Sequence, residues 1–135
     1  MRASGTFSVK SFVPTNVTPD PPITTALPVG ISLMEKQYEG EVTGRSATLF
    51  TSAFDQSSGA GTYFAMESFE GSLAGKSGSF NFIHSAATTG SDRTDEFVTI
   101  VANSGTAELT GITGTGQVTV DEDGTHRVSF EYDLP

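Results

Sequence analysis

The stretch from Tyr63 to Thr88, YFAMESFEGSLAGKSGSFNFIHSAAT, decides the fold. Two runs in which apolar and polar residues alternate flank the glycine-rich segment from Gly75 to Gly78. This pattern is typical of two antiparallel strands joined by a tight turn. A loop of two or of four residues in this turn pairs Leu73 with Phe80, which fixes the register of the whole hairpin.

Two polar residues, Glu67 and His84, lie on the face of this hairpin that the alternation predicts to be inward. The register pairs Phe69 with His84 and Glu67 with Ala86, so Glu67 and His84 are diagonal neighbours, roughly 5–8 Å apart between backbones. A carboxylate and an imidazole are costly to bury unless they pair or perform a function. We therefore take Glu67 and His84 as candidate catalytic residues. The predicted inward face comprises Tyr63, Ala65, Glu67, Phe69, Leu73, Phe80, Phe82 and His84.

The size and composition predict a single β domain spanning residues 1–135. The chain has 135 residues, with 15 glycines and no cysteine. This composition suits many short strands with tight turns, and it excludes disulfides and thiolate metal sites. The opening residues contain no apolar signal-peptide core, and no apolar run is long enough to span a bilayer as a helix. We therefore expect a cytoplasmic protein.

The charge balance argues against two classes of partner. The formal net charge is −9, from 16 acidic and 7 basic residues. Such a surface repels phosphate groups, so we expect no nucleic-acid partner and no membrane partner. The acidity is explained by solubility alone.

Proline and turn signals divide the chain into eight expected strands. The segment from Pro14 to Pro28 holds five of the six prolines, and proline cannot donate to a sheet ladder. Residues 14–30 are therefore expected to form a long loop, which is either a lid over one end of the fold or a mobile surface loop. One helical turn is expected near residues 107–109. The expected strands are residues 3–13, 31–41, 45–55, the two runs of the central hairpin, 92–102, 117–120 and 126–134.

The last two strands are expected to form a hairpin with a three-residue loop, Glu122-Asp123-Gly124. This loop aligns Val118 with Val128 and Val120 with His126, and it places glycine at the position that needs a left-handed backbone. Phe130 and Tyr132 then face inward together with Val128.

Eight antiparallel runs at short spacing indicate a closed barrel or a sandwich. The hydrophobic content, 36%, is modest for two fully packed sheets. We therefore predict an all-β fold, an eight-stranded antiparallel β-barrel, whose interior has room for side chains or for one small ligand.

Three segments resemble a known family: ASGTFSVKSF (residues 3–12), FAMESFEGSLAGKSGSFNFIHS (residues 64–85) and SGTAELTGITGTG (residues 104–116). They resemble small uncharacterised bacterial proteins that are grouped with the allene oxide cyclase-like barrels. The resemblance implies an eight-stranded barrel with an internal cavity and implies little about activity. It maps an acid and a histidine that recur in that family onto Glu67 and His84. The chain shows no residue-level match to the catalytic residues of plant allene oxide cyclases, so that chemistry is not transferred.

Motifs for other chemistries are absent. Gly75-Lys76-Ser77 lacks the upstream glycine spacing and the following helix of a phosphate-binding loop. Only two histidines are present, His84 and His126, and they are far apart in sequence. We therefore expect no metal site and no cofactor.

The residues support three hypotheses. In the first, the barrel binds a small, mainly apolar or amphipathic molecule and Glu67 and His84 fix its polar end. In the second, the protein is an isomerase or cyclase in which Glu67 and His84 move a proton. In the third, the barrel is packed solid and is an assembly module. Lys36 either points inward to pair with a carboxylate or extends outward, and a homo-oligomer is left open. The predicted ligand-binding residues are Tyr38, Tyr63, Phe69, Phe80, Phe82, Phe130 and Tyr132.

Overall fold

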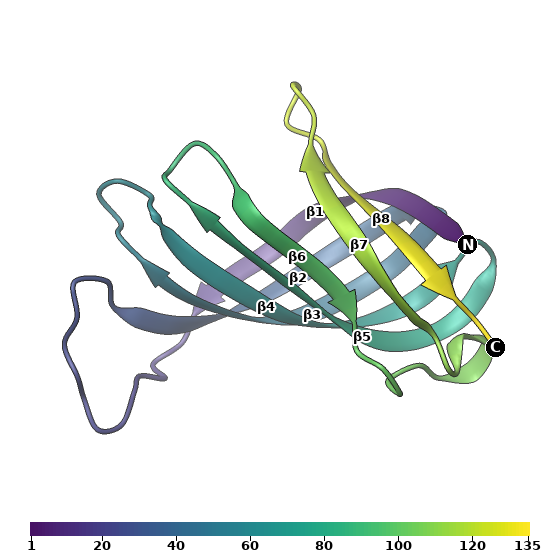
Figure 1. The fold of residues 1–135 in the computed structure, drawn as a ribbon, viewed down its shortest axis with the longest axis horizontal. Helices are drawn as coiled ribbons and strands as arrows, with labels where there is room; N and C mark the ends of the chain where they lie inside the picture. The colour runs from purple at the N-terminus through teal and green to yellow at the C-terminus, as the bar shows by residue number, and fades with distance from the viewer.

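The computed structural model describes all residues from 1 to 135 and shows a closed barrel of eight antiparallel strands (Figure 1). Each strand pairs with the next one along the chain, and the first strand also pairs with the last, which closes the barrel. The predicted eight-stranded antiparallel barrel is therefore confirmed. No helix is long and apolar enough to cross a membrane. The elements are β1 (Arg2–Pro14), β2 (Val29–Gly40), β3 (Val42–Phe54), β4 (Gly61–Leu73), β5 (Lys76–Thr88), β6 (Thr94–Ile100), the 3-10 helix η1 (Ala107–Leu109), β7 (Thr113–Val120) and β8 (His126–Asp133).

Up-and-down connectivity sends alternate loops to opposite ends of the barrel. The turns β2–β3 and β4–β5, the segment with η1 and both chain termini lie at one end. The loops β1–β2, β3–β4, β5–β6 and β7–β8 surround the other end, which we call the mouth. The β1–β2 connection, residues 15–28, contains no helix or strand and projects away from the barrel (Figure 1).

The register of the central hairpin differs from the predicted one. Leu73 pairs with Lys76, and the loop consists of Ala74 and Gly75, both with positive φ (47° and 87°). Two positive φ values are the requirement of a type I′ turn, whose twist matches that of the strands. The predicted turn from Gly75 to Gly78 was therefore wrong.

This correction leaves every side chain on its predicted face. Phe80 pairs with Phe69 instead of Leu73, so the register moved by an even number of residues, and only an odd shift exchanges faces. Glu67 pairs with Phe82 rather than Ala86. His84 is therefore still a diagonal neighbour of Glu67, on the opposite diagonal.

The terminal hairpin has the predicted register. Val118 pairs with Val128 and Val120 with His126. Gly124, the last residue of the three-residue loop, has φ of 88°, in the left-handed region. The short predicted strand from Gln117 extends further back, because β7 begins at Thr113.

Aromatic side chains fill the half of the barrel away from the mouth. Phe80, Phe82 and Phe130 are at most 2% exposed, and their ring centroids are 5.2–6.0 Å apart. Leu109 of η1 and Ile112 after it are fully buried in the same core and close that end. The remaining internal space therefore lies towards the mouth.

Candidate functional site

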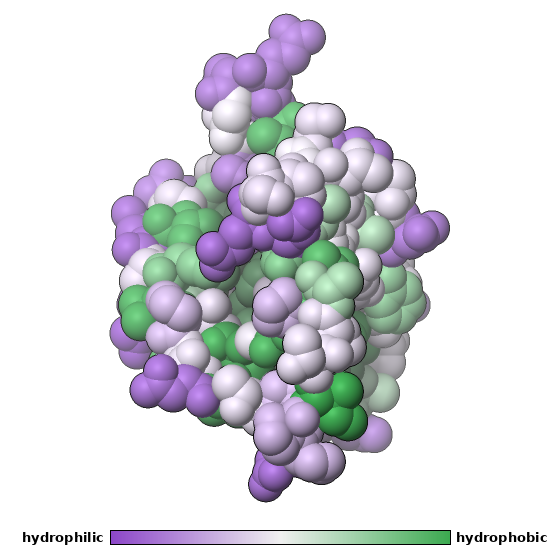
Figure 2. Space-filling model, turned by 90° about the vertical axis from the view of Figure 1, so that its left-hand side faces the viewer, coloured by the Kyte–Doolittle hydropathy of each residue, from purple (hydrophilic) through white to green (hydrophobic).

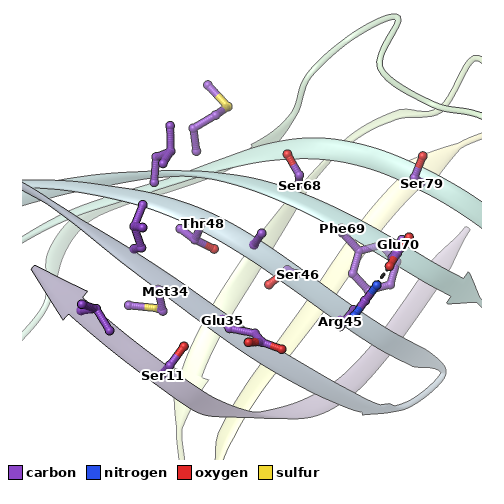
Figure 3. A pocket seen from close by; sticks show the side chains of 15 residues that line it. Ser11, Met34, Glu35, Arg45, Ser46, Thr48, Ser68, Phe69, Glu70 and Ser79 are labelled. Atoms are coloured by element: carbon purple, nitrogen blue, oxygen red, sulfur yellow. Dashed lines mark hydrogen bonds and ion pairs between the residues drawn. The ribbon is translucent and has the colours of Figure 1, made fainter. Parts of the chain in front are cut away.

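The structure has two substantial hollows, and only one contains buried titratable groups. The larger, about 890 Å³, lies on the outer wall over β1 to β5 (Figure 3). Most of its lining side chains point outward, among them the half-exposed Leu33 and Leu49 and the exposed ion pair of Arg45 with Glu70. The smaller, about 420 Å³, opens at the mouth and contains both histidines of the chain. We therefore take the mouth cavity as the candidate functional site.

The wall of the mouth cavity combines aromatic and aliphatic side chains with polar and charged ones. Figure 2 views the molecule from the mouth side and shows apolar surface between polar side chains. The Phe50 and Tyr63 rings stack with centroids 4.9 Å apart. The rings of Tyr63 and His84 form a T-shaped pair with centroids 5.5 Å apart. On the facing wall, Phe7 and His126 lie 5.2 Å apart. The volume of the mouth cavity falls within the range of about 300–1,000 Å³ typical of small-molecule sites.

Glu67 lies below this cavity, fully buried, and all its hydrogen bonds are made within the barrel. Its Oε2 accepts from Lys36 Nζ at 3.1 Å. Its Oε1 accepts from the Ser46 hydroxyl at 2.6 Å and from the Tyr38 hydroxyl. Burial first, and the Glu67 charge second, raise the pKa of Tyr38 well above its ordinary value, so this phenol remains a donor. Glu67 is thus an anchor for neighbouring strands and does not itself line the cavity.

Lys36 connects this anchor to the cavity. Its side chain is 8% exposed and points inward, which settles the alternative that the sequence left open. The ammonium group lies 4.8 Å from the centre of the Phe7 ring, a cation–π contact, and the residue lines the cavity. An ammonium group has three donors, and only the bond to Glu67 is formed within the chain.

His84 is the buried group of the cavity that has no hydrogen-bond partner in the chain. Its side chain is 7% exposed, and Nε2 makes no hydrogen bond within the chain. Burial, followed by the charge of Lys36, lowers the pKa of His84 below its ordinary value of 6.5, while Glu96 opposes this shift. The imidazole is therefore neutral at neutral pH, and it can donate or accept a proton or a hydrogen bond.

The carboxylate that faces the imidazole is Glu96, which sequence reasoning missed. Glu96 Oε2 lies 3.6 Å from His84 Nε2, beyond hydrogen-bonding distance, and its Oε1 accepts from the Val118 backbone N–H at 3.1 Å. Arg93 Nη1 lies 3.9 Å from the same Oε2. Alternation from the inward Val98 could have indicated Glu96, although the positive φ of Asp95 (53°) makes the backbone of β6 irregular just before this position.

The predicted site residues separate into three groups in the structure. Tyr63 and His84 line the mouth cavity, and Tyr38 and Glu67 are bound to each other beneath it. The other predicted ligand-binding residues are buried in the hydrophobic core of the closed half of the barrel. These are Phe69, Phe80, Phe82, Phe130 and Tyr132. No hydrogen bond joins Glu67 to His84, and no group of three or more metal-ligating side chains is assembled.

A family model described as a protein of unknown function, DUF3224, matches residues 3–132, nearly the whole chain. The chain belongs to the DUF3224 family. The crystal structure of a DUF3224 protein of unknown function from Shewanella oneidensis MR-1 is similar, with a TM-score of 0.82 and 28% sequence identity, over 100% of this chain and 98% of that one. No curated protein matches. The resemblance to a family of uncharacterised proteins is thus confirmed.

Proposed function

We propose that this protein binds a small, mainly apolar molecule in the mouth cavity and that His84 holds the polar end of this molecule. The observation that supports this most directly is a partly aromatic hollow of about 420 Å³ in which a buried imidazole nitrogen has no partner in the chain. Leaving a buried polar atom unpaired costs about 1–3 kcal/mol. A ligand that completes this hydrogen bond recovers that cost. We place this activity in the cytoplasm, as expected for a chain whose fold needs no disulfide.

Glu67 has an indirect role in this proposal. Its negative charge keeps the Lys36 ammonium in place at the edge of the cavity, and the Tyr38 and Ser46 hydroxyls fix the carboxylate itself. The polar end of the ligand is therefore expected to meet His84 and Tyr63 rather than Glu67.

Filling the cavity tests this proposal. Ala65 lines the cavity and pairs with His84 across β4 and β5, so Ala65→Phe places a ring in the ligand space. Met66→Phe is the matched control, because Met66 points outward and is 41% exposed. The wild type and the control are expected to bind the neutral fluorophore phenylnaphthylamine. Ala65→Phe is expected to lose most of this binding. Equal binding by all three proteins would refute the site.

A second candidate function, an isomerase, is supported by the position of Glu96. A neutral imidazole with a carboxylate 3.6 Å from its Nε2 is suited to proton transfer once a substrate tightens the geometry. This candidate predicts that a ligand carried through purification, identified by native mass spectrometry, is converted by the wild type and not by His84→Gln. A ligand that both proteins bind and that neither converts would leave binding as the function.

A further inference from the structure

The two basic side chains that line the mouth cavity each have an acidic partner within the chain. The ammonium of Lys36 is paired with Glu67 at 3.1 Å, and the guanidinium of Arg93 lies 3.9 Å from Glu96. The remaining charged residue of the lining is Asp92, whose carboxylate accepts from the backbone N–H and the hydroxyl of Thr89, each at 2.7 Å. Neither basic side chain of the lining is therefore without an acidic partner.

A carboxylate on the ligand would consequently meet no basic side chain that lacks an acidic partner. Moving a charge out of water is costly unless a partner of opposite sign receives it. A carboxylate would have to compete with Glu67 for Lys36 or with Glu96 for Arg93. A cationic group would face the same two basic side chains, and the only carboxylate of the lining, that of Asp92, is exposed and already accepts two hydrogen bonds from Thr89. The arrangement thus favours a neutral ligand.

The hydrogen-bonding groups that remain free are mainly donors. The Tyr63 side chain lines the cavity and its hydroxyl makes no hydrogen bond within the chain; burial raises its pKa, so it retains its proton at neutral pH. The Lys36 ammonium has donors beyond the bond to Glu67, and a neutral His84 carries one N–H. The complementary ligand group is an acceptor without a charge.

We infer that the ligand of the mouth cavity is a neutral molecule with a hydrogen-bond-accepting oxygen, such as a ketone or an ester, on an apolar body, and that ionised carboxylic acids are excluded. This inference rests on the proposed function and gives the ligand its chemical class. Tyr63 donates to the acceptor oxygen, and the aromatic wall formed by Phe7 and Phe50 contacts the apolar body.

Three probes of nearly equal size separate these possibilities: methyl naphthyl ketone, ethylnaphthalene and naphthoate. Binding is measured by titration calorimetry at pH 7.5 with the full chain. The wild type is expected to bind the ketone about fivefold to tenfold more tightly than the hydrocarbon, as one hydrogen bond allows. Naphthoate is expected to bind at least about a hundredfold more weakly than the ketone.

Two variants identify the groups responsible. Tyr63→Phe is expected to remove most of the advantage of the ketone and to leave the affinity for ethylnaphthalene unchanged. Glu96→Gln leaves Arg93 without its partner and is expected to raise the affinity for naphthoate. If either variant fails to fold by circular dichroism, the comparison of the three probes on the wild type still decides.

Different outcomes would refute the proposed function and the chemical class of the ligand. Naphthoate binding to the wild type as tightly as the ketone would overturn the inference and leave the proposed function standing. Equal affinity for ketone and hydrocarbon would also overturn it. If none of the three probes binds, the proposed function fails, and the inference fails with it.

Discussion

Lys36 on β2 and Glu67 on β4 meet inside the barrel, with Nζ 3.1 Å from Oε2, although β3 lies between their strands. The side chains are 8% and 0% exposed, so the pair is almost fully removed from water. The attraction in such a pair is offset by the cost of desolvating both charges. Replacing both residues should therefore change the free energy of unfolding much less than leaving one of the two charges unpaired.

A double-mutant cycle on this pair is expected to be strongly non-additive. Lys36→Met and Glu67→Gln each leave a buried group without its partner and are expected to lower the free energy of unfolding by about 3–5 kcal/mol. The double variant is expected to lose clearly less than the sum of the two. Urea denaturation followed by circular dichroism measures all four proteins. Additive losses would show that the two charges do not interact in solution.

Two hydroxyl groups on β3 are expected to respond oppositely to removal. Ser46 donates to Glu67 at 2.6 Å, whereas the buried Thr48 hydroxyl has no partner within the chain. Ser46→Ala should cost about 1.5–3 kcal/mol, because a hydrogen bond to a buried charge is lost. Thr48→Val keeps the shape and removes an unpaired group, so the free energy of unfolding should stay equal or rise by about 1 kcal/mol.

Thermal and urea unfolding of the two single variants give this comparison directly, with the wild type as the reference. A loss on Thr48→Val as large as that on Ser46→Ala would contradict the different bonding of the two hydroxyls.

The sequence was sufficient to predict the barrel and which side chains of the central and terminal hairpins face its interior. The inward placement of Glu67 and His84 depended only on alternation, and the even register shift in the central hairpin left it intact. The register itself depended on the turn. The observed loop is Ala74 and Gly75. The glycines on both sides of Lys76 and Ser77 had instead indicated a loop centred on those two residues.

The partners of Glu67 and His84 could not be predicted in the same way. Lys36 reaches Glu67 across an intervening strand because the barrel wall curves, and pairwise strand registers do not contain that curvature. Glu96 reaches His84 after an irregularity in the β5–β6 pairing between Ser85 and Ala87. The location of free space also escaped prediction, because it depends on how far the phenylalanine rings fill the closed half.

Gly44, where β3 and β4 approach each other closely, is expected not to tolerate a methyl group. Gly44 pairs with Gly71, has φ of +138°, and a Cβ there would lie 2.2 Å from the Glu70 carbonyl oxygen. Gly44→Ala should therefore lower the free energy of unfolding by more than about 2 kcal/mol. Gly30→Ala is the control, because a Cβ there meets nothing within 4 Å. That control should be neutral or stabilising by up to about 1 kcal/mol, as measured by urea denaturation. Equal effects of the two substitutions would rule out the close strand contact at Gly44.

Titration of His84 is expected to make the protein less stable as the pH falls from 7 to 5. The pKa of His84 is lowered in the folded protein, by burial first and by Lys36 second, below the ordinary value of 6.5 that applies to the unfolded chain. Between these two pKa values the unfolded chain binds the proton and the folded protein does not, so acid favours unfolding. Above about pH 6.5 the imidazole is neutral in both states and this loss disappears.

The loss of folding stability that protonation of His84 causes can be separated from the loss that protonation of the carboxylates causes. Asp55, Asp92 and Asp123 have pKa values lowered below 3.8 by hydrogen bonds, so their contribution is lost only at lower pH, near and below 3.8. Between pH 7 and 5 the wild type should therefore lose stability with a slope of at most about 1.4 kcal/mol per pH unit from this one group. The free energy of unfolding of His84→Gln should depend less on pH. In the wild type, the NMR resonance of the His84 imidazole, assigned by its absence from the spectrum of this variant, should titrate below pH 6.5. Equal slopes for both proteins, or a titration above 6.5, would show that His84 is not held neutral by its buried position beside Lys36.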